Sequence, residues 1–286
     1  MYKILRHNLL LAYFISLQVL LIFAKILHMS TFHSLTIKDI RRETPHAVSI
    51  AFDIPQNLKD DYKFLAGQYI NLKTHYEGQE IRKAYSICSA PGSGELRVAI
   101  KAVKNGGFSV FANERLTVGD KMEVGTPEGK FTFEPKPDRQ RNYAAFVAGS
   151  GITPVLAIIQ SVLQGEPEST FVLVYGNKSP EETIFHQVLH DLQLEYVGRL
   201  FVHFVYSQSK AEDSLFGRIE RSTVNFIIRN RHKEKEFEKF YLCGPEEMIL
   251  TVNEVLKENN VPEKDIKFEL FSTPIAEKKI VENLDG

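Results

Sequence analysis

Apolar and polar residues alternate in short segments through the first half of the chain, from residue 35 to residue 133. The clearest segments are HAVSIAFDIP, GQYINLKT, ELRVAIKAV and DKMEVGTPEGKFTF, and glycine, proline, asparagine or aspartate interrupts the chain between them. Alternation with turn residues at this spacing is typical of an antiparallel barrel or sandwich. The polar stretch 134–142 then holds two prolines and predicts a domain boundary.

The pattern changes after this boundary. YAAFVAG at 143–149 is a continuous apolar run, as expected of a buried parallel strand, and PVLAIIQSVLQG follows with helical periodicity up to Gly165. Further strands are predicted at 170–177, 200–208, 239–245 and 265–271, and further helices at 181–193 and 246–260. This alternation indicates a parallel sheet with helices on both faces, whose functional site lies at the carboxyl ends of its strands.

The N-terminal segment 8–24 is mostly apolar, with Lys3 and Arg6 before it and Lys25 after it. At 17 residues it is near the lower limit for a spanning helix, and it lacks a small-residue cleavage site ahead of Met29. An anchor, an interfacial helix and residues outside the natural protein are the alternatives. We expect residues 1–28 to be an over-long start or a peripheral anchor, because a spanning helix with its charges inside would export everything after it.

The composition limits the number of domains and the kinds of function that the chain can have. A chain of 286 residues suggests one large domain or two ordinary ones, and 43% hydrophobic with 25% charged residues allows substantial cores. The net charge of −1 and the lack of a basic block give no electrostatic reason for nucleic-acid binding. Cys88 and Cys243 are far apart and form no CxxC pair, which argues against a disulfide framework or a metal site. A reduced cytoplasmic location fits this cysteine usage.

The strongest local motif of the second half is AGSGITP, between a buried strand and a helix. Gly149 and Gly151 allow a tight turn, Pro154 suits a first helical turn, and the helix N-terminus offers free amides to a phosphate. The motif departs from GxGxxG, and the next strand ends in Asn177 and Lys178 rather than in an acid for a ribose. A plain strand–helix turn and a pyrophosphate site both remain open on this motif alone.

The stretch IRKAYSICSAP places two cations ahead of two hydroxyl-bearing residues: Arg82 and Lys83, then Tyr85 and Ser86. A strand that only packed would not require this cluster. The motifs FLAGQY, KAYSICSAP, GGFS, GSGITP, VYGN and CGPEEM occur in this order. Together they resemble the ferredoxin–NADP reductase superfamily, most closely the reductase components of bacterial ring-hydroxylating and phenylacetyl-CoA oxygenase systems. The resemblance spans residues 32–274.

The resemblance implies a six-stranded antiparallel Greek-key FAD-binding barrel over 32–136 and a Rossmann-like NAD(P)-binding domain over 141–274. Tyr85 would then stack on the flavin ring, and Ser86 would hydrogen-bond near its reactive nitrogen. Lys83 stands where the family has an arginine, with Arg82 one residue earlier; a lysine cannot grip a phosphate bidentately. The resemblance also implies that the flavin pyrophosphate binds at the start of a helix, which indicates FAD. The residues concerned are Gly106, Gly107 and Ser109.

The same resemblance implies that Cys243 faces the nicotinamide, that Gly244 and Pro245 shape the turn after it, and that Thr153 guides the nicotinamide. Glu269 and Phe271 resemble the terminal acid and aromatic ring of the family. Ser86, Cys243 and Glu269 are therefore the predicted groups around hydride transfer. Ordinary packing is the alternative for Cys243 and for Phe271, because free cysteines and phenylalanines are usually buried.

The donor is predicted as NADPH, with NADH as the alternative. Lys178, Ser207 and Lys210 can surround a 2′-phosphate, although Gln208 stands where the family often has an arginine. Solvated surface cations are the alternative reading of both lysines.

The predicted function is an FAD-dependent NAD(P)H oxidoreductase that passes electrons to a ferredoxin-type iron–sulfur partner. Many similar reductases carry a third domain with four cysteines, which this chain lacks, and residues 275–286 resemble the linker into such a domain. We expect either a shortened chain or a separate carrier. Two alternatives remain. One is a membrane-anchored cytochrome reductase. The other is a non-catalytic flavin- or nucleotide-binding module, and Lys83 in place of the family arginine is the only feature that points to it.

Overall fold

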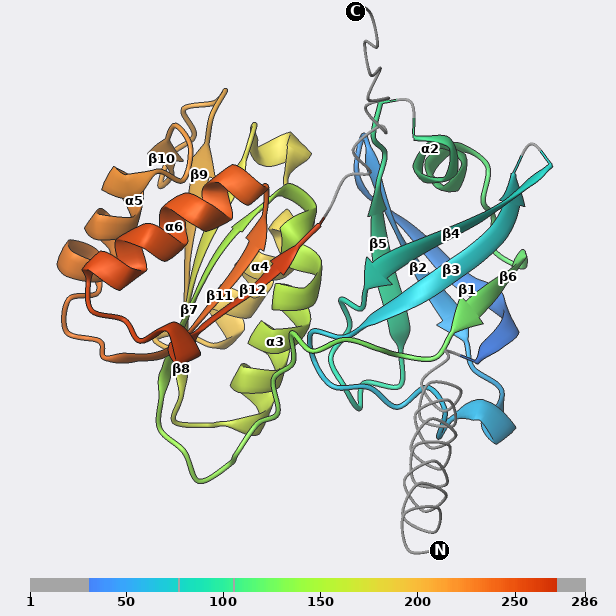
Figure 1. Ribbon diagram of the computed structural model, residues 1–286, viewed down its shortest axis with the longest axis horizontal. Coiled ribbons are helices and arrows are strands. Elements are labelled where there is room, and N and C mark those ends of the chain that lie inside the picture. Colours follow the sequence, from blue (N-terminus) through green and yellow to red (C-terminus); the bar gives the residue numbers. More distant parts are fainter. Residues whose placement is uncertain (1–30, 77, 105, 272–286) are drawn as a thin grey trace, which may run out of the picture.

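The computed structural model describes residues 31–76, 78–104 and 106–271. It contains an antiparallel barrel and a parallel α/β domain, which lie side by side (Figure 1). The predictions for residues 1–28 and 275–286 fall outside the described residues. Within the described ranges, no helix is both long enough and apolar enough to cross a membrane.

The first domain is a six-stranded antiparallel barrel with strand order β4-β3-β6-β1-β2-β5. Its strands are β1 (Phe32–Thr44), β2 (Ala47–Asp53), β3 (Tyr69–Tyr76), β4 (Gln79–Ser86), β5 (Leu96–Lys101) and β6 (Lys121–Gly125). The sheet closes where Ile87, just past β4, bridges Val98 on β5 and the Cys88 amide donates to the Arg97 carbonyl at 2.9 Å. Because β6 then lies beside β3, strands β3 to β6 have the predicted Greek-key order.

Alternation along each barrel strand sends one set of side chains inward. Val48, Ile50 and Phe52 of β2 lie in the barrel core with Val98 and Ile100 of β5. The short 3₁₀ helix η1 (Gln56–Leu58) follows β2, and helix α2 (Gly107–Glu114) follows β5. The alternating pattern predicted a barrel or a sandwich, and the structure confirms the barrel that the resemblance implied.

The second domain is a parallel sheet with strand order β10-β9-β8-β7-β11-β12. Its strands are β7 (Asn142–Ala148), β8 (Thr170–Asn177), β9 (Leu200–Tyr206), β10 (Leu215–Phe216), β11 (Phe237–Gly244) and β12 (Ile266–Leu270). The continuous apolar runs are buried, as predicted, because helices cover both faces of the sheet.

The helices differ from the expectation in two places. Helices α3 (Ile152–Gly165) and α4 (His186–Glu195) lie on one face, and α5 (Arg221–Asn225), the π-helix η4 (Phe226–Arg231) and α6 (Glu246–Glu258) lie on the other. Helix α4 begins later than predicted, because Phe185 has φ 62° and separates it from the 3₁₀ helix η3 (Pro180–Glu182). The α5–η4 segment was not anticipated. Two further 3₁₀ helices are η2 (Gly149–Gly151) and η5 (Glu263–Asp265).

Helix α3 faces the barrel (Figure 1) and shares one buried cluster with it. The small side chains Ala47 and Ala99, on the outer face of β2 and β5, belong to this cluster together with Val155 and Ile159 of α3. The Lys267 ammonium group of β12 also donates, at 2.7 Å, to the carbonyl of Thr132, which lies between β6 and β7 at the end of the barrel domain. This packing brings the barrel close to the carboxyl ends of the parallel strands.

Candidate active site

Three residues predicted to surround hydride transfer come together where the barrel meets the parallel sheet. Cys243 on β11 and Glu269 on β12 are register partners in the parallel ladder. Ser86 ends barrel strand β4, opposite Tyr69 on β3. The hydroxyl of Ser86 interacts with the carboxylate of Glu269, so that residues from two domains form one cluster.

Glu269 has an unusual electrostatic environment. Burial raises the pKa of Glu269 to about 7, and the hydrogen bond from Ser86 offsets part of this rise. One carboxylate oxygen, Oε2, is buried and has no hydrogen-bond partner among the described residues. An unpaired buried acceptor is costly unless a ligand completes its bonding, so this oxygen points to a ligand-facing role.

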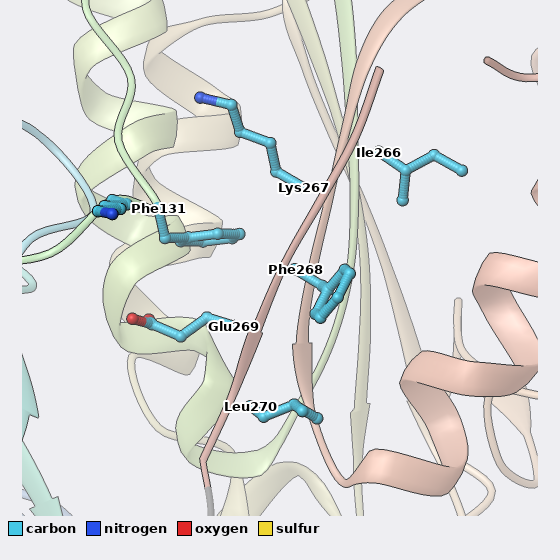
Figure 2. Close-up of a pocket in the computed structure, with 7 residues that line it drawn as sticks. Phe131, Ile266, Lys267, Phe268, Glu269 and Leu270 are labelled. Atoms are coloured by element: carbon cyan, nitrogen blue, oxygen red, sulfur yellow. The ribbon is translucent and has the colours of Figure 1, made fainter. Parts of the chain in front are cut away.

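An open pocket of about 390 Å³ runs along the edge of β12. Figure 2 shows that Lys267 and Glu269 extend to one side of the strand with Phe131, whereas Ile266, Phe268 and Leu270 extend to the other. This is the two-residue alternation of a β-strand. Phe271, the last described residue, is 37% exposed, which argues against the alternative of ordinary core packing.

Cys243 is fully buried, and burial raises the pKa of its thiol, with a further rise from the nearby Glu269 charge. The thiol is therefore neutral and suited to contact rather than nucleophilic attack. Gly244 follows with φ 155°, and a Cβ there would lie 2.8 Å from Met248 Cε. Pro245 caps the start of α6. Cys88, read from the sequence as a packing residue, is also buried.

The AGSGITP motif forms the turn between β7 and α3, beside Cys243. Gly149 has φ 55°, in the left-handed region that favours glycine. A Cβ on Gly151 would lie 2.2 Å from the Cys243 carbonyl oxygen, so only glycine fits there. The Thr153 hydroxyl donates to the Ser150 carbonyl at 3.0 Å. Pro154 is the third residue of α3 and so lies in its first turn.

The two predicted cations, Arg82 and Lys83, lie on opposite sides of the sheet because they are neighbours on strand β4. Tyr85 lies opposite Ile70 and Lys83 lies opposite Leu72, so both are on the side of the sheet that carries the barrel core. Arg82 is on the other side, where its guanidinium lies 4.6 Å from the centre of the Phe32 ring. Lys83, and not Arg82, therefore shares a side with Tyr85.

The start of helix α2 lies near Tyr85, whose ring centre is 5.8 Å from that of Phe108. Burial raises the pKa of the Tyr85 phenol, which stays protonated. The helix begins at Gly107 and is capped by Gly106. The Ser109 hydroxyl donates to the Gly106 carbonyl and accepts from the Val103 amide, both at 3.2 Å. Ser109 thus already holds the loop together.

The residues predicted to choose the nucleotide lie past the ends of β8 and β9. The Ser207 amide donates to the Asn177 carbonyl at 3.0 Å, and the Gln208 amide donates to the Lys178 carbonyl at 2.9 Å. These bonds extend the parallel pairing by two residues. Lys178 and Lys210 are both exposed, and the Lys210 ammonium lies 5.4 Å from the Phe216 ring centre.

Sequence reasoning missed several polar groups around this region. Glu182 of η3 lies 3.7 Å from His46 of the barrel and also interacts electrostatically with Lys101. Tyr69 pairs with Ser86 and interacts with the Glu269 charge. Tyr175 contacts the glycine turn through its hydroxyl. The two tyrosines lie inside the motifs FLAGQY and VYGN, but the contact of Glu182 with the barrel had no local signal.

Comparisons with known families agree with this two-domain fold. Residues 34–133 match the oxidoreductase FAD-binding domain, and residues 146–254 match the oxidoreductase NAD-binding domain. The structure is similar to a ferredoxin NADP⁺ reductase from Neisseria gonorrhoeae, solved with bound FAD and NADP. The TM-score is 0.70 at 20% identity, over 85% of this chain and 99% of that one, which establishes the likeness of fold.

Two curated relatives extend the comparison to sequence. The chain is 41% identical over 247 residues to one of the subunits of the 1,2-phenylacetyl-CoA epoxidase of Escherichia coli K12, covering 86% of this chain and 69% of that protein. It is 29% identical over 258 residues to the ferredoxin reductase component of 3-ketosteroid-9-alpha-monooxygenase of Rhodococcus rhodochrous, covering 88% and 69%. The chain belongs to the FAD- and NAD-binding oxidoreductases of the ferredoxin–NADP reductase family.

Proposed function

We propose that this protein is the flavoprotein reductase of an oxygenase system, which takes electrons from NADPH and passes them to an iron–sulfur acceptor. The observation that carries the proposal is the meeting of Ser86, Cys243 and Glu269 at the junction of the FAD- and NAD-binding domains. The names of the two curated relatives, an epoxidase subunit and a ferredoxin reductase component, support an oxygenase partner. We place the domain boundary between residues 136 and 141.

The residues around the junction fit a flavin and a nicotinamide nucleotide. Glu269 has a buried carboxylate oxygen, Oε2, with no hydrogen-bond partner among the described residues. Gly151 leaves no room for a side chain beside Cys243, so the backbone of the glycine turn approaches the same point. Bound flavin would accept a hydride from the nicotinamide and release electrons one at a time. The remaining task of the protein is to position both groups and to control protons.

The cluster and the residues beside it have distinct proposed roles. Lys83 and the amides at the start of α2 bind the FAD phosphates, and the Tyr85 ring supports the flavin. The neutral thiol of Cys243 contacts the nicotinamide without reacting with it. Ser86 and Glu269 hold a proton between them, because a carboxyl with a pKa of about 7 exchanges protons readily at neutral pH.

NADPH is the proposed donor, because Lys178 and Lys210 are exposed beyond β8 and β9 and can reach a 2′-phosphate. Ser207 lies between them in the chain and offers a hydroxyl. Lys178→Ala and Lys210→Ala should each raise the KM for NADPH and leave the KM for NADH unchanged. Equal effects on both nucleotides would reject this assignment.

The proposed function is tested by anaerobic titration of the purified protein with NADPH and with NADH, following the visible absorbance of bound flavin. We expect bleaching of the flavin, faster with NADPH. Reduction of a [2Fe–2S] ferredoxin by the same protein would support the iron–sulfur acceptor. Protein that binds no flavin after incubation with FAD, or whose flavin neither nucleotide reduces, would contradict the proposal.

A further inference from the structure

Tyr175 of β8 makes a contact with the glycine turn that the reaction described above does not use. Its side chain is completely buried, and its hydroxyl donates to the Gly149 carbonyl oxygen at 2.8 Å. The Ile184 carbonyl oxygen lies farther from the same hydroxyl, at 3.3 Å. A phenol has one proton to donate, and the shorter distance makes Gly149 its main acceptor.

The Gly149 carbonyl is held from two directions. The Ile152 amide at the start of α3 donates to the same oxygen. The two lone pairs of this carbonyl are therefore both engaged, one by its own helical turn and one by the neighbouring strand. Because β7 and β8 are adjacent in the sheet (Figure 1), Tyr175 reaches the turn from inside the domain.

This arrangement decides where the next amide points. The peptide between Gly149 and Ser150 is planar and trans, so its N–H points opposite to its carbonyl. With the carbonyl held inward by Tyr175, the Ser150 N–H points away from the buried hydroxyl. Gly149 and Ser150 are both partly exposed, and the space around a Cβ on Gly149 is open to 4 Å.

Without the hydrogen bond from Tyr175, Gly149 would permit the Gly149–Ser150 peptide to take the opposite orientation. Its φ of 55° shows a backbone already in a region that glycine enters without strain, and glycine also tolerates the rotated peptide. Rotation would turn the carbonyl oxygen outward and present a partial negative charge where a nucleotide phosphate approaches. A fixed outward N–H attracts that phosphate, whereas an outward carbonyl repels it.

We propose that Tyr175 is a positioning residue that locks the Gly149–Ser150 peptide so that the Ser150 N–H faces the pyrophosphate of the nicotinamide nucleotide. This inference rests on the proposed function, since it assumes that the glycine turn receives that nucleotide. It assigns to a buried tyrosine, outside the turn itself, control over the affinity for the nucleotide.

Tyr175→Phe tests the lock, because it removes only the hydroxyl and keeps the ring in the core. The KM for NADPH should rise about tenfold, which corresponds to ~1.4 kcal/mol, while kcat for reduction of an artificial electron acceptor changes by less than about twofold. FAD content should be unchanged, because the flavin-side residues lie on the barrel. A purely structural role would instead lower FAD content, kcat and nucleotide affinity together.

Tyr241→Phe is the matched control. Tyr241 lies on β11 of the same sheet, is 2% exposed, and its phenol makes no hydrogen bond within the described part of the chain. The KM for NADPH of this variant should equal that of the wild type. A wild-type KM for Tyr175→Phe, or an equal rise in both variants, would overturn the inference.

A measurement on the wild-type protein does not depend on how the variant folds. Hydrogen–deuterium exchange of the segment 148–152 should slow when NADP⁺ is added, because the Ser150 amide gains an acceptor. If NADPH reduces the bound flavin but exchange in this segment does not change, the lock is rejected and the proposed function stands. If neither NADPH nor NADH reduces the flavin of the wild-type protein, the proposed function itself is rejected.

Discussion

Gly151 passes so close to Cys243 that a Cβ on Gly151 would lie 2.2 Å from the Cys243 carbonyl oxygen and 2.5 Å from its carbon. Both are backbone atoms of strand β11, so they cannot rotate away as a side chain can. The close approach joins the start of α3 to the strand that carries Cys243, whose thiol we propose to face the nicotinamide. It therefore couples the stability of the domain to the geometry of the proposed site.

Gly151→Ala should destabilise the protein by about 1–3 kcal/mol, because the added methyl group must push α3 away from β11. It should also raise the KM for NADPH, since the glycine turn moves with the helix. Gly176→Ala is the control, because its Cβ would meet only side-chain atoms, Ile219 Cδ1 at 3.3 Å and Ala148 Cβ at 3.6 Å, and no backbone within 3.6 Å. Thermal melting and steady-state kinetics of the two variants give the comparison. Equal stability of both variants would contradict the close approach.

Glu269→Gln should change how stability depends on pH. Burial raises the pKa of Glu269 from 4.5 to about 7, so between these values the unfolded chain has released a proton that the folded protein keeps. Stability therefore falls as pH rises through this window, and glutamine removes that loss. Urea unfolding at pH 5 and pH 7.5 should show the variant gaining on the wild type at the higher pH. The exposed Glu114→Gln should show no such gain.

His203 and His232 should give stability a pH dependence of the opposite sign to that of Glu269. Their Nε2 atoms are 2.8 Å apart, so one ring donates and the other accepts, and burial lowers the pKa of each to about 4. The unfolded chain binds protons near pH 6.5, so stability is complete above that pH and is lost as pH falls toward 4. His203→Leu should flatten this loss in urea titrations between pH 7 and pH 5. The exposed His190→Gln should retain the wild-type slope.

Glu166 should prove important for holding the interdomain segment. Its buried carboxylate accepts from the Tyr143 hydroxyl at 2.9 Å, the Ser169 hydroxyl at 2.7 Å and the Lys136 amide at 2.9 Å. Glutamine would replace one acceptor by a donor, so Glu166→Gln should cost about 1–3 kcal/mol in unfolding free energy. The neighbouring, exposed Glu168→Gln should cost almost nothing. A similar loss in both variants would show that the three bonds contribute little.

Much of the fold was predictable because its signals are local. The inward residues Val48, Ile50 and Phe52 follow the two-residue period of a strand, and the continuous run at 143–149 follows from burial on both faces. The later start of α4 was not predictable in this way. Its apolar pattern continues through Phe185, but the left-handed backbone at that residue interrupts the helix.

The sequence by itself determined the two domains, the family motifs and the types of residue that reach the site, because backbone periodicity and turn chemistry are written in neighbouring positions. Only the tertiary structure decided that Ser86 meets Glu269, that Lys83 rather than Arg82 shares a side with Tyr85, and that Tyr175 holds the glycine turn. These relationships depend on strand register and on how the barrel packs against the sheet. Contacts between distant segments leave no local pattern from which they can be read.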